Sequence, residues 1–270
     1  MTKLNILDKK YNFLRPIKID NLIRLGANKD GGYIVDSKTV DKSQILVSFG
    51  LGPQWDFELD YIKRNKNLLI SVYDHTVSEL PYLKEIWKYF RRYVTFRVPF
   101  KALKDRINYY RAYKNFLNST KVKYYKEKIT YPIKEKIDTD IKKVFSRIHS
   151  SSEVIMKSDI EGSEYDIIDQ ILEYSERIQM LIVEFHWIDK KEQIFVESVK
   201  KLQSKFNIIH IHGNNHHQKL SSGLPIVLEI TLLNKKNTIK ENEWVEDFPI
   251  KDLDFPNNPY LEDLAFSFRD

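Results

Sequence analysis

Three carboxylates stand close together directly after one apolar run, and a fourth ends the next run. Asp159, Glu161 and Glu164 lie within six residues of one another, and Glu184 is followed two residues later by His186. Carboxylates and imidazoles from neighbouring strand ends can converge within a few ångströms. Such a set can bind a divalent ion or act as an acid/base pair.

The sequence leaves two chemical schemes open for these residues. In one, Asp159, Glu184 and a histidine, His212, hold Mg²⁺ or Mn²⁺, ions that suit oxygen ligands with one or two imidazoles. In the other, His186 or His212 is a general base that Asp159 or Glu184 orients. Glu164 is expected instead near the start of a helix, where it would favour the positive end.

A pair of glycines and one aspartate suggest a place for a nucleotide-like ligand. Gly50 and Gly52 follow an apolar run, and glycine there permits a tight turn and close approach to a ligand that helix N–H groups face. Asp74 lies 22 residues beyond Gly52, where a carboxylate can accept hydrogen bonds from the ribose of an adenosine cofactor. Two plainer interpretations stay open, a strand-to-helix turn at the glycines and a helix N-cap at Asp74.

Alternating apolar runs and amphipathic segments predict the elements that would position these residues. Strands are expected at 44–49, 68–73, 93–98, 154–158, 180–184, 208–211 and 226–233. Helices are expected at about 54–65, 78–91, 163–174 and 189–204. Strands that alternate with helices form a mostly parallel sheet with helices on both faces, and the short last loop predicts an antiparallel edge strand. Ligands then bind beyond the carboxyl ends of the strands, where the residues above fall.

The 270 residues allow one large α/β domain. We expect an N-terminal preface at 1–43 that contributes to the cofactor pocket, the main domain at 44–235, and a C-terminal tail at 236–270 that packs on it. A basic helical insert is expected at about 100–150, because residues 101–150 hold 14 Lys or Arg and 5 Asp or Glu. That balance suggests an anionic partner, although a solvated helical surface is the plainer interpretation.

Composition excludes several classes of protein. The chain has no cysteine, which rules out disulfides and thiolate metal sites. No run approaches the roughly 20 apolar residues of a membrane span, and the N-terminus lacks the apolar core of a signal peptide. We therefore expect a cytoplasmic protein without a membrane span, and a homo-oligomer is left open.

The chain resembles the FkbM-like family of S-adenosylmethionine-dependent methyltransferases, in its branch associated with bacterial surface polysaccharide. The segments that carry the resemblance are 24–33, 48–52 with 57–58, 73–74, 157–165, 183–186 and 212–215. The block Lys-x-Asp-x-Glu-Gly-x-Glu at 157–164 is the most specific of them. The resemblance implies a Rossmann-like methyltransferase fold with seven strands, the last one antiparallel.

The resemblance also implies a cofactor and its contacts. S-adenosylmethionine would lie over Gly50 and Gly52, with Asp74 on its ribose. Many family members carry an acidic residue before the first glycine, and this chain has Ser48 there. The methionine end would then be held by Asp30 and the Gly31-Gly32 backbone. We also expect Glu161 to bind the cofactor.

These expectations lead to a sugar O-methyltransferase. The acceptor would be the hydroxyl of a nucleotide-activated sugar for capsule or another surface polysaccharide, with its diphosphate on the basic segment. A lipid-linked glycan would also fit. Two other classes stay open, a nucleic-acid-binding or RNA-modifying protein that uses residues 101–150, and an NAD-dependent sugar-nucleotide dehydrogenase. Nucleic acid is the less favoured partner, because the sequence contains no recognised RNA or DNA module.

Overall fold

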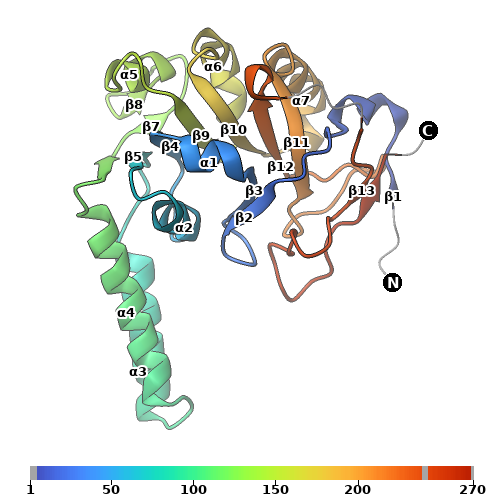
Figure 1. Cartoon of the computed structure of the whole chain (residues 1–270). Helices are drawn as coiled ribbons and strands as arrows, with labels where there is room; N and C mark the ends of the chain where they lie inside the picture. Colours follow the sequence, from blue (N-terminus) through green and yellow to red (C-terminus); the bar gives the residue numbers. More distant parts are fainter. Residues whose placement is uncertain (1–4, 239–242, 269–270) are drawn as a thin grey trace.

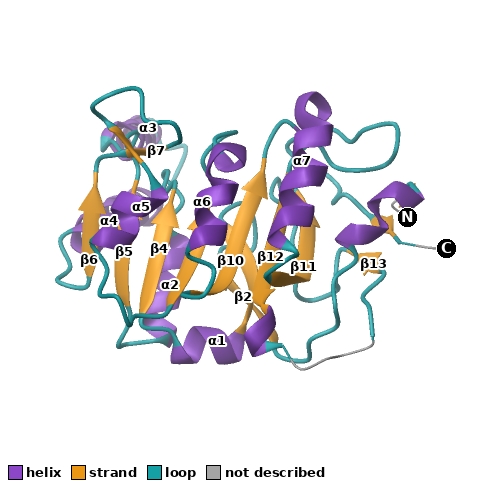
Figure 2. Ribbon diagram, turned by 90° about the horizontal axis from the view of Figure 1, so that it is seen from above, coloured by secondary structure: helices purple, strands orange, loops and turns teal. Residues whose placement is uncertain are grey.

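The computed structural model describes residues 5–238 and 243–268. A seven-stranded sheet in the order β11-β12-β10-β9-β4-β5-β6 runs through the middle of the molecule (Figures 1 and 2). Its strands are β4 (Ile45–Phe49), β5 (Leu69–Tyr73), β6 (Val122–Tyr125), β9 (Val154–Ser158), β10 (Ile178–Phe185), β11 (Phe206–Gly213) and β12 (Leu228–Asn234). Strand β12 is antiparallel to β10 and β11, and the other pairings are parallel. The predicted seven-stranded, mostly parallel sheet is confirmed, and its antiparallel strand lies one position inside the edge strand β11.

Both faces of the sheet are covered, as Figure 2 shows. One face carries α5 (Ile141–Ser146), α6 (Ile168–Glu173) and α7 (Ile188–Leu202). The other carries α1 (Ser37–Lys42), α2 (Asp56–Arg64) and a hairpin of β2 (Leu22–Gly26) and β3 (Gly32–Asp36). Side chains of β4 alternate between the two cores, with Val47 and Phe49 in one and Leu46 in the other. Burial on both faces explains why this strand is apolar apart from Ser48.

Helices α3 (Leu80–Val94) and α4 (Phe100–Leu117) form an antiparallel hairpin that projects from the body of the molecule (Figure 1). The expected strand at 93–98 is wrong, because these residues end α3 and form the turn. The third strand is β6, which lies inside the expected insert at 100–150. Strand β6 belongs to the main sheet, and α5 belongs to the layer of helices that covers it. The segment that projects from the domain is therefore residues 80–117.

The remaining elements are short. They are β1 (Asn5–Ile6), β7 (Lys128–Ile129), β8 (Asp138–Thr139), β13 (Asp247–Phe248), β14 (Phe266–Ser267) and 3₁₀ turns at Lys9–Leu14, Glu164–Ile167 and Lys235–Asn237. Strands β1, β14 and β13 pair into a small sheet that joins the two ends of the chain. The tail reaches back to the main sheet, where Asp254 lies 3.0 Å from His210 Nε2. Of the expected N-terminal and C-terminal segments, residues 1–4, 239–242 and 269–270 lie outside the described residues.

The strand order reverses between β4 and β9. The chain runs outward from β4 through β5 to β6, and then returns to build β9 and β10 on the other side of β4. In open α/β sheets, ligands bind in the crevice that such a reversal opens at the carboxyl ends of the strands. Gly50 directly follows β4 and Asp159 directly follows β9 at this crevice. Among the described residues, no helix combines the length and apolar character that crossing a bilayer requires.

Candidate functional site

A cavity of about 550 Å³ opens at the carboxyl ends of the parallel strands. Small-molecule sites typically measure about 300–1,000 Å³. Loops after β4, β5, β9, β10 and β11 contribute to its walls. The residues expected at a site that line it are Asp30, Gly31, Gly50, Gly52, Asp74, Asp159, Glu161, Glu184 and His186.

Asp159, Glu184 and His186 form a compact group in the wall of this cavity. Each offers one ligand atom, and these atoms lie within 4.8 Å of one another. Nε2 of His186 is 3.9 Å from Asp159 Oδ1 and 4.0 Å from Glu184 Oε2. Two carboxylates and one imidazole are a donor set that Mg²⁺ or Mn²⁺ accepts.

Glu164 positions the imidazole of His186. Its Oε1 accepts the backbone N–H of His186 at 2.6 Å and lies 3.3 Å from Nδ1 of the same residue. Its Oε2 accepts the backbone N–H of Gly162 at 2.7 Å. Burial lowers the pKa of His186, but the Glu164 carboxylate and nearby acids outweigh burial and raise it. A carboxylate on one ring nitrogen leaves the other directed at a ligand, as in many metal-binding histidines.

This role for Glu164 corrects one expectation from the sequence, although Glu164 does stand at the start of a helical turn as expected. Asp159 and Glu184 were expected to orient a histidine, but they face Nε2 of His186, and Glu164 holds Nδ1. The side chain of Glu164 is fully buried. A buried carboxylate needs partners, and here they are the two backbone donors and the ring.

The surroundings of Glu184 disfavour the ionised form of its carboxyl group. Burial, and then the charges of Asp159 and Glu229, raise the pKa of Glu184 well above its ordinary value. Asn214 donates its Nδ2 to Glu184 Oε1 at 2.8 Å and partly offsets this effect. A cation beside these carboxylates would favour their ionised forms.

A buried ion pair supports the floor of the cavity. The Lys157 ammonium donates to the backbone oxygen of Gly50 at 2.8 Å and lies 3.6 Å from Glu58 Oε1. Burial lowers the pKa of Lys157, but Glu58 and the carboxylates of the cavity outweigh burial and raise it. Ser48 donates its hydroxyl to the same Glu58 oxygen at 2.5 Å. Helix α2 therefore places a carboxylate beside the serine that precedes the first glycine.

Gly50 allows the ends of β4 and β9 to meet. Its φ is +77°, and a Cβ added there would lie 1.7 Å from the backbone oxygen of Asp159. Only glycine fits such a position. At Gly52 φ is +55°, and the nearest atom to an added Cβ is 4.0 Å away. The two glycines therefore have different roles, and Gly50 sets the position of Asp159.

Asp74 clamps the glycine loop from the end of β5. Its Oδ2 accepts the backbone N–H groups of Leu51 and Gly52, each at 2.9 Å. Its Oδ1 accepts the backbone N–H of Thr76 at 2.7 Å and the Thr76 hydroxyl at 2.6 Å. Burial raises the pKa of Asp74, but these hydrogen bonds outweigh burial and lower it. Four donors match the four lone-pair sites of a carboxylate, so a ribose hydroxyl would have to share or displace one.

His212 does not belong to this group. It lies on β11, two strands from Glu184, which corresponds to about 10 Å at the usual strand spacing. Its Nδ1 is 3.5 Å from Glu229, and its Nε2 is 3.2 Å from Asp263 of the tail. Burial lowers the pKa of His212, but these two carboxylates raise it to about 10. The expectation of His212 as base or metal ligand is therefore corrected, because its two ring nitrogens face Glu229 and Asp263 and its side chain does not line the cavity.

Gly32 is also absent from the cavity wall. A Cβ added to Gly32 would lie 2.1 Å from the backbone oxygen of Ala27 and 2.6 Å from the Arg24 guanidinium. This glycine permits close packing within the β2–β3 hairpin. The neighbouring Asp30 and Gly31 do line the cavity, and Asp30 donates its backbone N–H to the Asn257 oxygen of the tail at 3.1 Å.

Several lining residues were not predicted as site residues. Tyr33 donates its hydroxyl to Asp159 Oδ2 at 3.1 Å. His216 and His217, expected in an exposed loop, are exposed and line the cavity. Lys157 was visible as the first residue of the most specific motif. Tyr33 and the histidine pair carried no distinguishing spacing, because the tertiary fold alone brings them to the strand ends.

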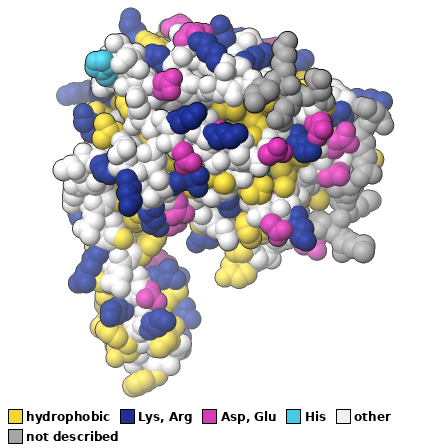
Figure 3. All heavy atoms as spheres, in the orientation of Figure 1, with side chains coloured by type: hydrophobic (Ala, Val, Ile, Leu, Met, Phe, Trp, Pro, Cys, Tyr) yellow, Lys and Arg dark blue, Asp and Glu magenta, His cyan; other side chains and the backbone are white. Residues whose placement is uncertain are grey.

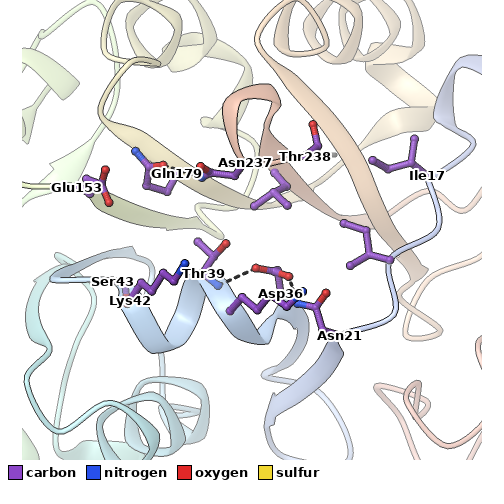
Figure 4. Close-up of a pocket in the computed structure, with 13 residues that line it drawn as sticks. Ile17, Asn21, Asp36, Thr39, Lys42, Ser43, Glu153, Gln179, Asn237 and Thr238 are labelled. Carbon is purple, nitrogen blue, oxygen red and sulfur yellow. Dashed lines mark hydrogen bonds between the residues drawn. The ribbon is translucent and has the colours of Figure 1, made fainter. Parts of the chain in front are cut away.

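A second cavity of about 340 Å³ lies at the opposite, amino-terminal edge of the sheet (Figure 4). Its wall includes Asp36 and Thr39 at the start of α1, Glu153 before β9 and Gln179 in β10. Asp36 accepts the backbone N–H of Thr39 at 2.7 Å, as a helix cap. None of the residues expected at a functional site lines this cavity.

Comparisons with known proteins add a likeness in fold. No family model matches the sequence, and no curated protein matches it. Similar solved structures include a putative rRNA methylase from Clostridium thermocellum, with 11% identity, coverage of 76% of this chain and 88% of that chain, and a TM-score of 0.40. A predicted O-methyltransferase from Agrobacterium tumefaciens has 12% identity, coverage of 73% and 76%, and a TM-score of 0.37. A fibrillarin/Nop5p complex has 10% identity, coverage of 72% and 73%, and a TM-score of 0.37.

Two of these solved structures are named as a methylase or a methyltransferase, but likenesses this distant carry no argument about the reaction of this chain. The expected membership of the FkbM-like family stays a prediction. The functional conclusion therefore depends on the geometry of the cavity.

Proposed function

We propose that this protein is an S-adenosylmethionine-dependent O-methyltransferase whose acceptor is a sugar hydroxyl and which a divalent cation assists. The observation that carries the proposal is the convergence of Asp159, Glu184 and His186 beside the Gly50–Gly52 loop, at the reversal of a parallel sheet. One cavity is thus lined both by a glycine loop of the kind that binds nucleotides and by a set of side chains that can bind a cation.

The residues fit both groups on chemical grounds. S-adenosylmethionine supplies a methyl group bonded to a positively charged sulfur, and Asp30, Asp74, Asp159, Glu161 and Glu184 make the cavity rich in acids. At Gly52 the space beside the backbone is open, so a ligand can approach the main chain closely. Mg²⁺ or Mn²⁺ would be held by Asp159, Glu184 and His186, and it would supply Lewis acidity that lowers the pKa of a bound hydroxyl.

The chain's own residues have separable roles. Asp159 is fixed by its contact with Gly50 and by the Tyr33 hydroxyl. Glu164 fixes the ring of His186, which leaves Nε2 facing the cavity. Such fixed geometry aligns nucleophile, methyl carbon and leaving sulfur, which lowers the entropic part of the barrier. With no cation bound, the same Nε2 would be the candidate general base.

The acceptor we propose is a sugar that carries phosphate or diphosphate. Lys128, His216 and His217 lie at the cavity wall, and they could donate charge-assisted hydrogen bonds to phosphate oxygens. An RNA acceptor and a dehydrogenase reaction are the competing functions. Nicotinamide absorbance, or S-adenosylhomocysteine found by mass spectrometry in the purified protein, separates the dehydrogenase from the methyltransferase.

The test is incubation with isotopically labelled S-adenosylmethionine and a panel of sugar nucleotides, read as the mass gain of one methyl. Chelator treatment should abolish transfer, and Mn²⁺ should restore it. Asp159→Asn should abolish transfer with the fold intact, while the exposed Asp166→Asn, from the same segment, should not. Chelator-resistant transfer would remove the cation from the mechanism, and normal transfer by Asp159→Asn would refute the assignment of the site.

A further inference from the structure

In the part of the chain that the structure describes, no element covers one side of α3 in the α3–α4 hairpin. Leu80, Leu83, Trp87, Phe90 and Val94 recur at alternating steps of three and four residues, so they share one face of the helix. Their exposed fractions are 61%, 45%, 59%, 42% and 52%. The opposite side of α3 packs on α4, where the rings of Tyr82 and Tyr113 stack 4.4 Å apart. We call the five exposed residues the apolar stripe.

The apolar stripe continues onto the far end of the hairpin. Phe96 in the turn is 95% exposed, and Phe100 at the start of α4 is 56% exposed. Figure 3 shows hydrophobic side chains gathered along this projection and at its far end. Phe96 has a φ of +54°, a conformation that asparagine or glycine adopts more readily than phenylalanine.

The rest of the hairpin surface is strongly basic. Residues 80–117 contain ten Lys or Arg and two Asp or Glu. Lys84 and Arg91 each follow a stripe residue by one position, and both are exposed. Figure 3 shows Lys and Arg side chains beside the hydrophobic ones on the projection. A helix with a Trp, Phe and Leu face and Lys or Arg flanks is typical of helices that lie in the interface of a membrane.

We propose that the α3–α4 hairpin docks the protein on a membrane surface that contains anionic lipids. The apolar stripe and Phe96 would enter the boundary between headgroups and acyl chains, and the basic flanks would face lipid phosphates. This inference does not rest on the proposed methyltransferase function.

Two other occupants explain less of the surface. A second copy of the hairpin would cover the stripe, but it would bring two strongly basic surfaces together without counter-charge. A nucleic acid would supply counter-charge, but Leu80, Leu83 and Val94 have no ring on which a base could stack. An anionic lipid surface accounts for both the charge and the aliphatic residues.

The base of the hairpin adjoins the candidate active site. Tyr82 of α3 donates its hydroxyl to the backbone oxygen of Pro53 at 3.0 Å, and Pro53 lines the large cavity. Thr76, four residues before α3 begins, lines it as well. Docking by the hairpin would therefore hold the mouth of the cavity near the membrane.

The experiment is co-sedimentation of the full chain with vesicles. Binding is expected to vesicles of phosphatidylcholine mixed with phosphatidylglycerol, to weaken with added salt, and to be far weaker to phosphatidylcholine alone. Phe96→Asn should weaken binding about tenfold, since it removes an apolar anchor at a backbone position that asparagine accepts. The double variant Lys84→Gln/Arg91→Gln should weaken it about 30-fold, since each charge near the surface contributes about a fivefold step.

Matched controls come from exposed positions outside the hairpin. Tyr260 is 94% exposed, so Tyr260→Ser removes an equally exposed aromatic ring outside the hairpin. Lys66→Gln/Lys142→Gln removes two exposed charges outside the hairpin. Both controls should bind vesicles as the unmodified chain does, and thermal unfolding should show that all variants are folded. Absence of vesicle binding, equal loss in the controls, or dimerisation or RNA binding through the hairpin in its place would overturn the proposal.

Discussion

The contact between Gly50 and Asp159 yields the most specific prediction about how the fold builds the site. Gly50→Ala would place a Cβ 1.7 Å from the Asp159 backbone oxygen, at a φ of +77°. The left-handed conformation costs alanine about 1–2 kcal/mol. Relief of the overlap adds about 1–3 kcal/mol, as in other overpacked sites. We therefore expect Gly50→Ala to lower the free energy of unfolding by about 2–5 kcal/mol.

Gly52→Ala is the matched control, two residues further along the same loop. Its φ is +55°, and the nearest atom to the added Cβ is 4.0 Å away. Only the conformational cost of about 1–2 kcal/mol applies there. Urea unfolding of both variants measures the difference in their free energies of unfolding, provided that this free energy falls with urea concentration at the same slope in both.

The same pair of variants tests the candidate cation site. Displacement of the Asp159 backbone in Gly50→Ala should weaken Mn²⁺ binding about tenfold or more, as loss of a supporting contact does in other metal sites. Gly52→Ala should leave Mn²⁺ affinity unchanged, as read by electron paramagnetic resonance. Equal stability and equal Mn²⁺ affinity of the two variants would refute the claim that Gly50 positions Asp159.

Three further predictions follow from the contacts around the cavity and the tail. Glu164→Gln should weaken Mn²⁺ binding about 10–100-fold, because His186 loses its supporting carboxylate; a calorimetric titration with unchanged affinity would contradict this. Asp74→Ala should lower the free energy of unfolding by about 1–3 kcal/mol, because buried loop donors lose their acceptor. It should also weaken S-adenosylhomocysteine binding if the ribose shares this carboxylate, and equal affinity would remove the ribose contact. Since folding raises the pKa of His212 to about 10, its stabilising effect is complete below pH about 6.5 and is lost as pH rises through 10. Urea unfolding between pH 7 and 10 should show a steeper loss for the unmodified chain than for Asp263→Asn, and parallel profiles would contradict that linkage.

Most of the sheet could be predicted because buried parallel strands are short apolar runs with polar residues at their ends. The runs at 154–158 and 180–184 became β9 and β10, and the residues that follow them do reach one cavity. The order of strands could not be read from these runs. Pairing of β12 between β10 and β11 depends on long-range packing, which local sequence does not encode.

The third strand was mispredicted for an identifiable physical reason. Residues 93–98, Tyr-Val-Thr-Phe-Arg-Val, are rich in aromatic and β-branched types, which favours a strand locally. In the structure α3 continues through Val94, because its aromatic face packs on α4. Tertiary packing therefore outweighs local propensity there, and the true third strand β6 is only four residues long.

The candidate site was predictable where it depends on the order of neighbouring parallel strands, and it was not predictable where it depends on long-range packing. Asp159, Glu184 and His186 end neighbouring strands, so their convergence follows from the sheet alone. His212 also ends a strand, but β12 inserts between β11 and β10 and separates it from the group. The carboxylate of Asp263 in the tail contacts the ring of His212. The two residues are 51 positions apart in the sequence, so no local pattern predicts this contact.

Anomalous diffraction from crystals grown with Mn²⁺ and S-adenosylhomocysteine tests the central claim most directly. The account predicts a manganese peak bounded by Asp159, Glu184 and His186, with the thioether sulfur of the ligand in the same cavity and its adenosine over the Gly50–Gly52 loop. A ligand bound outside this cavity, or manganese bound away from these three side chains, would contradict it.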